Sequence, residues 1–261
     1  MRRVAGACAV RRSVVAFAVV PPPPAPPVAA VVDYQLGGAY EPADDVEVVT
    51  RDRTEEPADG RYSICYVNAF QTQPDAGTWW ETHHPDLLLR DDAAPVEDEG
   101  WPGEYLFDLS TEEKRFELAE IVRDWFAQCA DDGYDAVEPD NLDSYTRSGG
   151  RLDQADARAF AALLVADAHG ERLAIGQKNT ADLDGAALGF DFAVTEECAV
   201  YDECQVYTQM YGRHVIEIEY TDNGRAAYAE ACRDDAGTRS ILLRDRDVVP
   251  DSDPAYVFEH C

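Results

Sequence analysis

Residues 110–145, STEEKRFELAEIVRDWFAQCADDGYDAVEPDNLDSY, contain the pattern that decides the fold. They begin with a capping-box signature, Ser110 to Glu113, and continue with apolar residues at helical spacing as far as Cys129. A short apolar run, 136–138, follows, and such a run is typical of a buried strand. It leads directly into acidic and amide side chains. The stretch therefore predicts a helix that packs on a sheet, and a strand that ends in a polar site.

The same alternation continues through the rest of the chain. A second helix, rich in Ala and Leu, is predicted for residues 153–169. Strand–helix alternation over this length predicts an α/β fold with a parallel sheet, here a single-domain (β/α)8 TIM barrel. A barrel of this type needs eight strands, so one candidate, 33–36 or another, is expected to be an accessory strand. The nine strand candidates are 33–36, 46–50, 63–68, 105–109, 136–138, 173–176, 192–195, 215–220 and 241–244.

The charge of the chain excludes some partners. Its 261 residues include 52 Asp and Glu against 22 Lys and Arg, so the formal net charge is −30. Nucleic acid and anionic membranes are therefore not expected as partners, because both need a positive protein surface. The acidity fits ordinary solvation, a salty habitat or attraction of a cationic polymer, and charge alone does not separate these interpretations. A folded monomer without a membrane span is expected.

The N-terminal residues resemble an export signal. Four arginines precede an apolar stretch, 13–20, and Pro-rich and Ala-rich sequence continues to about residue 30. We therefore expect residues 1–30 to be a signal peptide with a Pro-rich leader. Residues 31–261 are expected to form the single folded domain, in a secreted, extracellular location.

The cysteines agree with export. Six follow the leader, and an even set in an exported chain predicts three disulfides, with fifteen possible pairings. The pair Cys198–Cys204 is favoured because only a short loop separates the two residues. A CxxC motif or a Cys/His cluster with metal-ligand spacing does not occur, so no metal and no cofactor are predicted. The disulfide candidates are Cys65, Cys129, Cys198, Cys204, Cys232 and Cys261.

Ionisable and amide side chains follow most of the predicted strands. The carboxyl ends of parallel barrel strands meet at one rim, where the active sites of TIM barrels lie. Carboxylates gathered there suit acid/base catalysis, and amides, lysine and tyrosine suit a polyhydroxylated or aminated ligand. The runs concerned are EPDNLD (138–143), QKN (177–179), TEEC (195–198), EYTD (219–222) and RDRD (244–247).

Six motifs occur in order along the chain: DYQLGG (33–38), ICYVNAF (64–70), DAVEPDNLDSY (135–145), IGQKN (175–179), VTEEC (194–198) and IEYTD (218–222). Together they resemble the endo-α-1,4-polygalactosaminidases of glycoside hydrolase family 114, over residues 33–261. The resemblance implies a TIM-barrel hydrolase that cuts internal α-1,4 bonds in polymers of galactosamine or N-acetylgalactosamine. A cationic polysaccharide of this kind is therefore the expected partner.

The acidic pair of the family falls on Asp140 and Glu196. We assign Asp140 as nucleophile and Glu196 as acid/base, the two roles that cleavage through an oxocarbenium-like transition state requires. Glu197 is an alternative to Glu196, since adjacent strand residues point to opposite faces and only one can enter the pocket. Glu138 shares a face with Asp140, so it is expected either to contact substrate or to shift the pKa of its neighbour.

Further side chains at the rim are candidate substrate contacts. Lys178, one of only two lysines, would keep a nearby carboxylate ionised. Tyrosine rings can stack on sugar faces; Tyr66 and Trp101 share that property, but aromatic residues more often pack in a core. The substrate-binding candidates are Tyr34, Glu138, Asn141, Asp143, Tyr145, Lys178, Asn179, Glu197, Glu219 and Tyr220.

Two alternatives stay open. One is a barrel that binds an amino-polysaccharide without cutting it, and the presence of both carboxylates counts against it. The other is a glycosidase of the same architecture that acts on another α-linked sugar. Sequence does not measure the pocket, so this second alternative remains.

Overall fold

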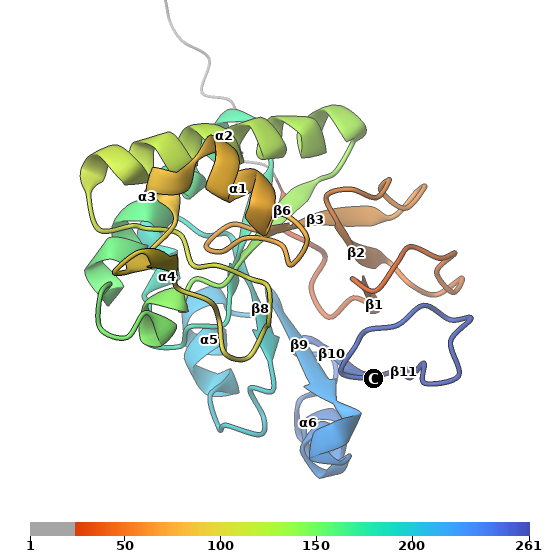
Figure 1. Cartoon of the computed structure of the whole chain (residues 1–261). Helices are drawn as coiled ribbons and strands as arrows, with labels where there is room; N and C mark the ends of the chain where they lie inside the picture. The colour runs from red at the N-terminus through yellow and green to blue at the C-terminus, as the bar shows by residue number, and fades with distance from the viewer. Residues whose placement is uncertain (1–23) are drawn as a thin grey trace, which may run out of the picture.

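Eight parallel strands surround a buried interior in the computed structural model, which describes residues 24–261 (Figure 1). Each strand pairs with the next one in the ring, and the order follows the sequence. The prediction of a (β/α)8 barrel is therefore confirmed. The strands are β1 (Val32–Gln35), β2 (Val48–Asp52), β3 (Tyr62–Asn68), β6 (Ala136–Asp140), β7 (Ala174–Lys178), β8 (Phe192–Glu196), β9 (Val215–Tyr220) and β10 (Ser240–Arg244).

The ring closes without a regular ladder between its first and last strands. The free edge of β10 pairs instead with a ninth, antiparallel strand, β11 (Phe258–His260). β1 and β10 lie side by side, and Arg244 connects them: its guanidinium donates to the carbonyl of Tyr34 and lies 3.2 Å from the carboxylate of Asp33. The accessory strand is thus β11, whereas the predicted strand 33–36 is the first strand of the barrel.

The prediction of a barrel strand at 105–109 is wrong. Its residues form isolated antiparallel bridges within the long connection after β3, such as Leu88 with Phe107. Leu106, Phe107 and Leu109 are fully buried there. A short apolar run signals burial, and periodicity alone does not distinguish a barrel strand from a buried loop.

Helices cover the outside of the barrel (Figure 1). The first predicted helix is present, and its N-cap is Thr111, whose hydroxyl accepts the Lys114 amide at 3.3 Å. The second predicted helix starts with a capping box between Asp153 and Asp156. The helices are α1 (Gly77–His83), α2 (Glu112–Asp132), α3 (Gln154–Gly170), α4 (Gly185–Leu188), α5 (Cys204–Tyr211) and α6 (Ala226–Asp235), with short 3-10 turns η1 (Pro85–Leu87), η2 (Ser144–Arg147) and η3 (Thr221–Asn223) and a small hairpin of β4 (Arg90–Asp91) and β5 (Ala94–Pro95).

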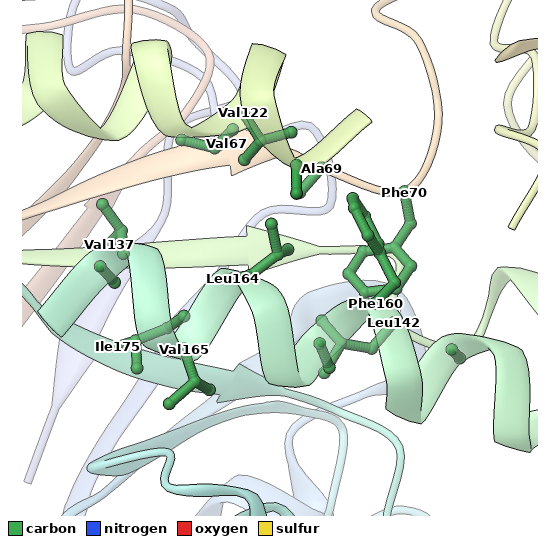
Figure 2. Packing of buried hydrophobic residues seen from close by; sticks show 14 of the residues in the cluster. Val67, Ala69, Phe70, Val122, Val137, Leu142, Phe160, Leu164, Val165 and Ile175 are labelled. Atoms are coloured by element: carbon green, nitrogen blue, oxygen red, sulfur yellow. The ribbon is translucent and has the colours of Figure 1, made fainter. Parts of the chain in front are cut away.

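Two apolar layers hold the strands in place. On the outer face, Val67, Val137 and Ile175 pack against α2 and α3, as Figure 2 shows. On the inner face, a small residue can make room for a large one on the next strand. Gly176 illustrates this fit, because a Cβ there would lie 2.7 Å from the ring of Phe192. The apolar inner layer fills the base of the barrel, and polar side chains occupy the positions above it.

Three disulfides join the predicted cysteines: Cys65–Cys129, Cys198–Cys204 and Cys232–Cys261. The first ties β3 to α2, and the last ties α6 to the residue after β11. Cys198 and Cys204 also lie close to Glu217, but their sulfurs are bonded to each other and are not free thiolates.

The predicted leader, 1–30, falls mainly on residues 1–23, which lie outside the described residues. From residue 24 onward the chain contacts the base of the barrel: the Tyr62 hydroxyl donates to the Pro24 carbonyl at 2.7 Å, and Ala30 is buried. Within residues 24–261, no helix has both the length and the apolar character needed to cross a membrane.

Candidate active site

A cleft of about 1240 Å³ opens at the carboxyl ends of the strands. Its floor consists of the last inward-facing residue of several strands, which is the consequence of strict alternation along each strand. Part of its wall comes from the long connection between β3 and α2. The predicted site residues that line it are Tyr34, Asp140, Asn141, Asp143, Lys178, Asn179, Glu196 and Tyr220.

One buried ammonium lies at the centre of this floor. The Nζ of Lys178 is 3.2 Å from Glu138, 3.3 Å from Asp140 and 3.4 Å from Glu196. It also donates to the Tyr34 hydroxyl at 3.1 Å. Burial by itself would lower the pKa of Lys178, but the three carboxylates outweigh that effect and hold the pKa well above its usual value. The lysine is therefore held in its charged form at neutral pH.

Asp140 is held in its ionised form. The Tyr66 hydroxyl donates to one of its oxygens at 2.7 Å, and the backbone N–H of Asn141 donates to the other at 2.8 Å. Burial opposes ionisation, but Lys178 and these hydrogen bonds prevail and lower the pKa of Asp140 below its usual value. An ionised carboxylate at the floor of the cleft has the state that a nucleophile needs.

Glu196 has a different environment on the other side of the lysine. The Tyr220 hydroxyl donates to one oxygen, and the Asn179 amide donates to the other at 3.1 Å. Burial raises the pKa of Tyr220, so this phenol stays neutral and keeps its proton to donate. The guanidinium of Arg246 lies 4.1 Å above the Tyr220 ring and holds it in place.

Glu138 lies beneath Asp140 and Glu196 and does not line the cleft. Its side chain is fully buried, and one oxygen accepts the Tyr34 hydroxyl at 2.6 Å. The other oxygen has no hydrogen-bond partner among the described residues. Burial raises the pKa of Glu138 to about 7, although Lys178 and Tyr34 act in the opposite direction. Of the two predicted roles for Glu138, its position disfavours substrate contact and fits a shift of a neighbouring pKa.

Glu138→Gln is expected to remove a pH-dependent loss of stability. The folded protein holds the Glu138 pKa at about 7, above the ordinary glutamate value of 4.5, so between these values it binds more protons than the unfolded chain. As the pH rises through that window, wild type should lose up to about 3 kcal/mol of unfolding free energy relative to the variant. Chemical denaturation of both proteins near pH 4.5 and near pH 8 measures this. If the difference in unfolding free energy between the two proteins were the same at both pH values, the raised pKa of Glu138 would be contradicted.

The strands that carry the site end in strained backbone. Asn141, Asn179 and Glu197, the residues directly after β6, β7 and β8, have φ values of 66°, 48° and 60°. Non-glycine residues rarely adopt this left-handed region, and asparagine tolerates it best. The turn at Asn141 points its N–H at Asp140, and the side chain of Asn179 bonds both the backbone and the carboxylate of Glu196. The strain thus orients the two carboxylates.

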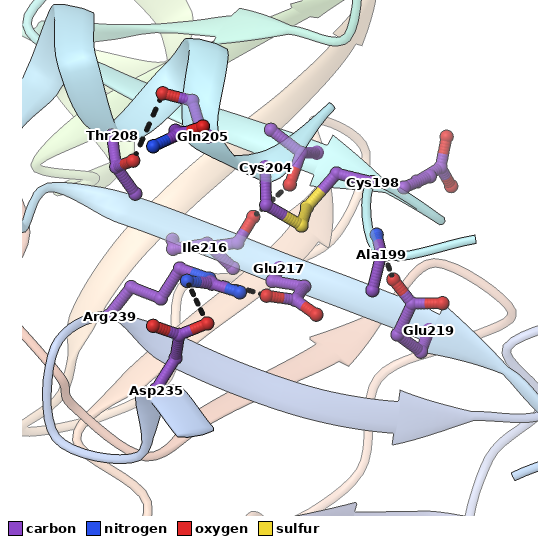
Figure 3. Close-up of a disulfide and its surroundings, with 12 residues drawn as sticks. Cys198, Ala199, Cys204, Gln205, Thr208, Ile216, Glu217, Glu219, Asp235 and Arg239 are labelled. Atoms are coloured by element: carbon purple, nitrogen blue, oxygen red, sulfur yellow. Dashed lines mark hydrogen bonds and ion pairs between the residues drawn. A yellow bond between two sulfur atoms is a disulfide. The ribbon is translucent and has the colours of Figure 1, made fainter. Parts of the chain in front are cut away.

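Three other predicted residues lie away from the cleft. Glu197 turns outward and accepts hydrogen bonds from the guanidinium of Arg246. Arg246 and Asn223 together lower the pKa of Glu197. Glu219 faces the outside of the barrel, where it accepts the Ala199 amide at 3.0 Å beside the Cys198–Cys204 disulfide (Figure 3). The Tyr145 hydroxyl donates to Asp182 instead of the cleft.

Strand alternation explains the placement of Glu219, which is adjacent to the inward-facing Tyr220 on β9 and so faces outward. Glu197 follows the end of β8 in the left-handed region, where its side chain accepts from Arg246. Neither side chain lines the cleft. Strand alternation also places Tyr66 on the inner face of β3, together with Ile64 and Asn68. Its aromatic ring alone would indicate only stacking on a sugar.

Other side chains that line the cleft have no signal in the sequence. Glu104 and Arg147 line the cleft together with Trp101, but they come from loops that have no periodicity. Arg147 pairs with Asp98 at 2.7 Å and with Asp143 at 2.9 Å, and so joins two distant segments of the wall. Such loop contacts depend on the tertiary structure.

Most glycoside hydrolases use a pair of carboxyl groups, and here two carboxylates lie together at the carboxyl ends of a (β/α)8 barrel. The sequence matches the model of glycoside-hydrolase family GH114 over residues 15–261. The chain therefore belongs to family GH114 and is a glycoside hydrolase. A comparison with curated proteins gives no match.

Solved structures agree on the fold. Ega3 of Aspergillus fumigatus, solved in complex with galactosamine, is 24% identical, with a TM-score of 0.72 over 95% of this chain and 100% of that one. The glycoside hydrolase domain of PelA from Pseudomonas aeruginosa is 15% identical, with a TM-score of 0.62 over 87% of this chain and 97% of that one. At these identities the likeness establishes the TIM-barrel fold.

Proposed function

We propose that the chain cleaves internal α-1,4 bonds in galactosamine-containing polysaccharide, with Asp140 as nucleophile and Glu196 as acid/base. The observation that carries this function is the placement of both carboxylates around the Lys178 ammonium, each within 3.4 Å of it. Each carboxylate accepts one phenol and one N–H beside the lysine: Asp140 accepts from Tyr66 and the Asn141 backbone, and Glu196 accepts from Tyr220 and Asn179. Lys178 and these contacts keep the pKa of Asp140 below its usual value, which fits the nucleophile, and the proposal gives Glu196 the proton-carrying role.

The spacing is compatible with a covalent intermediate. The nearest oxygens of the two carboxylates lie 3.3 Å and 3.4 Å from the same Nζ, so these two atoms are at most about 6.7 Å apart, a bound that admits the roughly 5–5.5 Å carboxyl separation of retaining enzymes. In the retaining course, Glu196 protonates the glycosidic oxygen while Asp140 attacks the anomeric carbon and the leaving chain departs. Glu196 then takes a proton from water, the water oxygen attacks the anomeric carbon, and Asp140 is released.

The cleft and the surface support the substrate class. A cleft of about 1240 Å³ exceeds the space that one sugar unit fills, as an enzyme that cuts within a chain requires. The net charge of −30 complements a polymer with free amino groups. Ega3, which shares the fold, was solved with galactosamine. Three disulfides support secretion, with residues 1–30 as the leader and residues 31–261 as the glycoside hydrolase domain.

The product pattern from partly deacetylated α-1,4-galactosaminogalactan tests this function. The disulfide-intact protein is expected to release a ladder of short hexosamine oligomers, measured by mass spectrometry. Monosaccharide alone would contradict cleavage within the chain. Binding without products would favour the non-catalytic barrel, and cleavage of a different α-linked polymer would favour the other glycosidase alternative.

A further inference from the structure

Glu104 lies in the wall of the cleft on a tightly folded loop, residues 98–104. The Asp98 amide donates to the Glu104 carbonyl at 2.8 Å, and the Glu104 amide donates to the Trp101 carbonyl at 3.1 Å. The Asp98 side chain also accepts the Gly100 amide at 2.9 Å. These bonds fix the backbone of Glu104, and its side chain is only 7% exposed. The carboxylate therefore has a defined position.

The protein supplies hydrogen-bond donors to only one of the two oxygens of the Glu104 carboxylate. Its Oε2 accepts the amide of Gln71 at 2.6 Å and the amide of Asn68 at 2.8 Å. Its Oε1 receives no donor from the described residues, although the side chain lines the cleft. Oε1 is not among the fully buried atoms that lack a partner, so it is open to the cleft. A ligand in the cleft can therefore donate to it.

Glu104 also lacks a cation, which sets it apart from the other buried acidic groups of the wall and floor. Asp98 has Arg147 at 2.7 Å, and Asp140 has Lys178 at 3.3 Å. Glu104 forms no such ion pair with any lysine, arginine or histidine of residues 24–261, and no cation lowers its pKa. Burial raises that pKa, partly against the two amide bonds, and the neighbouring carboxylates raise it further. A cation from outside the protein would offset both effects.

Glu104 is connected to the reacting end of the cleft. Asn68, which donates to Glu104, accepts the side-chain amide of Asn141 at 2.9 Å. The backbone N–H of Asn141 in turn donates to Asp140 at 2.8 Å. Two amide side chains therefore connect Glu104 to the backbone that holds Asp140, and Glu104, Asp140 and Glu196 line the same cleft.

We propose that Glu104 binds the primary ammonium of a 2-amino sugar beside the scissile bond, and so selects deacetylated units at that position. An ammonium supplies a donor to Oε1 and a charge opposite to that of the carboxylate. An N-acetyl group lacks the charge, adds bulk and leaves the buried carboxylate uncompensated. This assignment rests on the proposed cleavage of galactosamine polymers. It adds the residue that distinguishes a free amine from an N-acetyl group.

Glu104→Gln tests it, because the amide keeps the shape of the side chain and removes its charge. The substrates are one set of α-1,4-galactosamine oligosaccharides, before and after chemical N-acetylation. On the free amines, kcat/KM of the variant is expected to fall by at least about 30-fold, mainly through KM; on the acetylated set it should change less than about threefold. Glu120→Gln, an exposed position on α2, removes the same charge far from the cleft and controls for net charge.

Two results would overturn the assignment: equal losses of kcat/KM on both substrate sets, or no loss on the free amines. Binding of the same oligosaccharides separates it from the proposed cleavage. Calorimetry on the Asp140→Asn protein, with and without the additional Glu104→Gln change, measures that binding without turnover. If wild type cuts neither substrate set, calorimetry can still show a preference for free amines that depends on Glu104. That result would refute the proposed cleavage and support the ammonium site. Equal binding of free and acetylated amines would refute the site.

Discussion

Asp140→Asn is expected to lower polymer hydrolysis by at least about 1,000-fold and to change polymer binding by less than about threefold. The amide has nearly the same shape and still accepts the Tyr66 hydroxyl, but it cannot attack the anomeric carbon. Glu196→Gln should lose a similar factor on polymer. With an aryl glycoside whose leaving group needs no proton, Glu196→Gln should recover the first step, whereas Asp140→Asn should not.

Rates on polymer and on the aryl glycoside, with binding measured separately, give these factors. Asp124→Asn, on the exposed side of α2, is the matched control and should keep wild-type rates. Wild-type activity in either active-site variant would remove that residue from the mechanism. Recovery of Asp140→Asn on the aryl glycoside would reverse the two roles.

Lys178→Met is expected to cost stability as well as activity. The substitution keeps the length of the side chain but leaves three carboxylates around an uncharged position. Removal of one partner of a buried charge cluster typically costs about 3–5 kcal/mol. Activity should fall by at least about 100-fold at neutral pH, because the pKa of Asp140 rises once the ammonium that lowers it is gone.

The stability deficit of Lys178→Met should shrink as the pH falls. Without the lysine the carboxylate pKa values are higher in the folded than in the unfolded state, so protonation favours the folded state. Denaturation at acidic and neutral pH measures the trend. Lys114→Met is a natural control, since Lys114 is the other lysine of the chain and pairs with Asp108 near the surface; its cost should be about 1 kcal/mol or less. Equal costs for the two variants would contradict the central role of Lys178.

Local patterns predicted the residues of the floor because period-two alternation is a strong constraint. Once 136–138 is a strand that leads to Asp140, Glu138 and Asp140 share a face, and Lys178 and Glu196 come at the carboxyl ends of the next two strands. The predicted disulfide between Cys198 and Cys204 depended only on short separation. These features are local: the structure contains the disulfide and places Glu138, Asp140 and Glu196 around Lys178, whereas the roles of these residues stay predictions.

The wall could not be predicted in the same way. Glu104 contacts Asn68 across 36 positions of sequence, and Arg147 reaches Asp98 across 49. No periodicity encodes such contacts, since they depend on how a long loop folds back over the barrel. The prediction of a barrel strand at 105–109 failed for a different reason. The apolar character of these residues correctly indicated burial, but it did not show that they belong to the barrel sheet.

The junction between β1 and β10 has a further consequence. Arg244 joins the two strands through the carbonyl of Tyr34, and the hydroxyl of the same tyrosine bonds Glu138 and Lys178. The irregular junction of the ring and the proton-binding groups of the active site therefore share one residue. Because the Tyr34 hydrogen bond lowers the pKa of Glu138, a displacement of Tyr34 at this junction is expected to raise that pKa further, so the titration of Glu138 would report on the integrity of the ring.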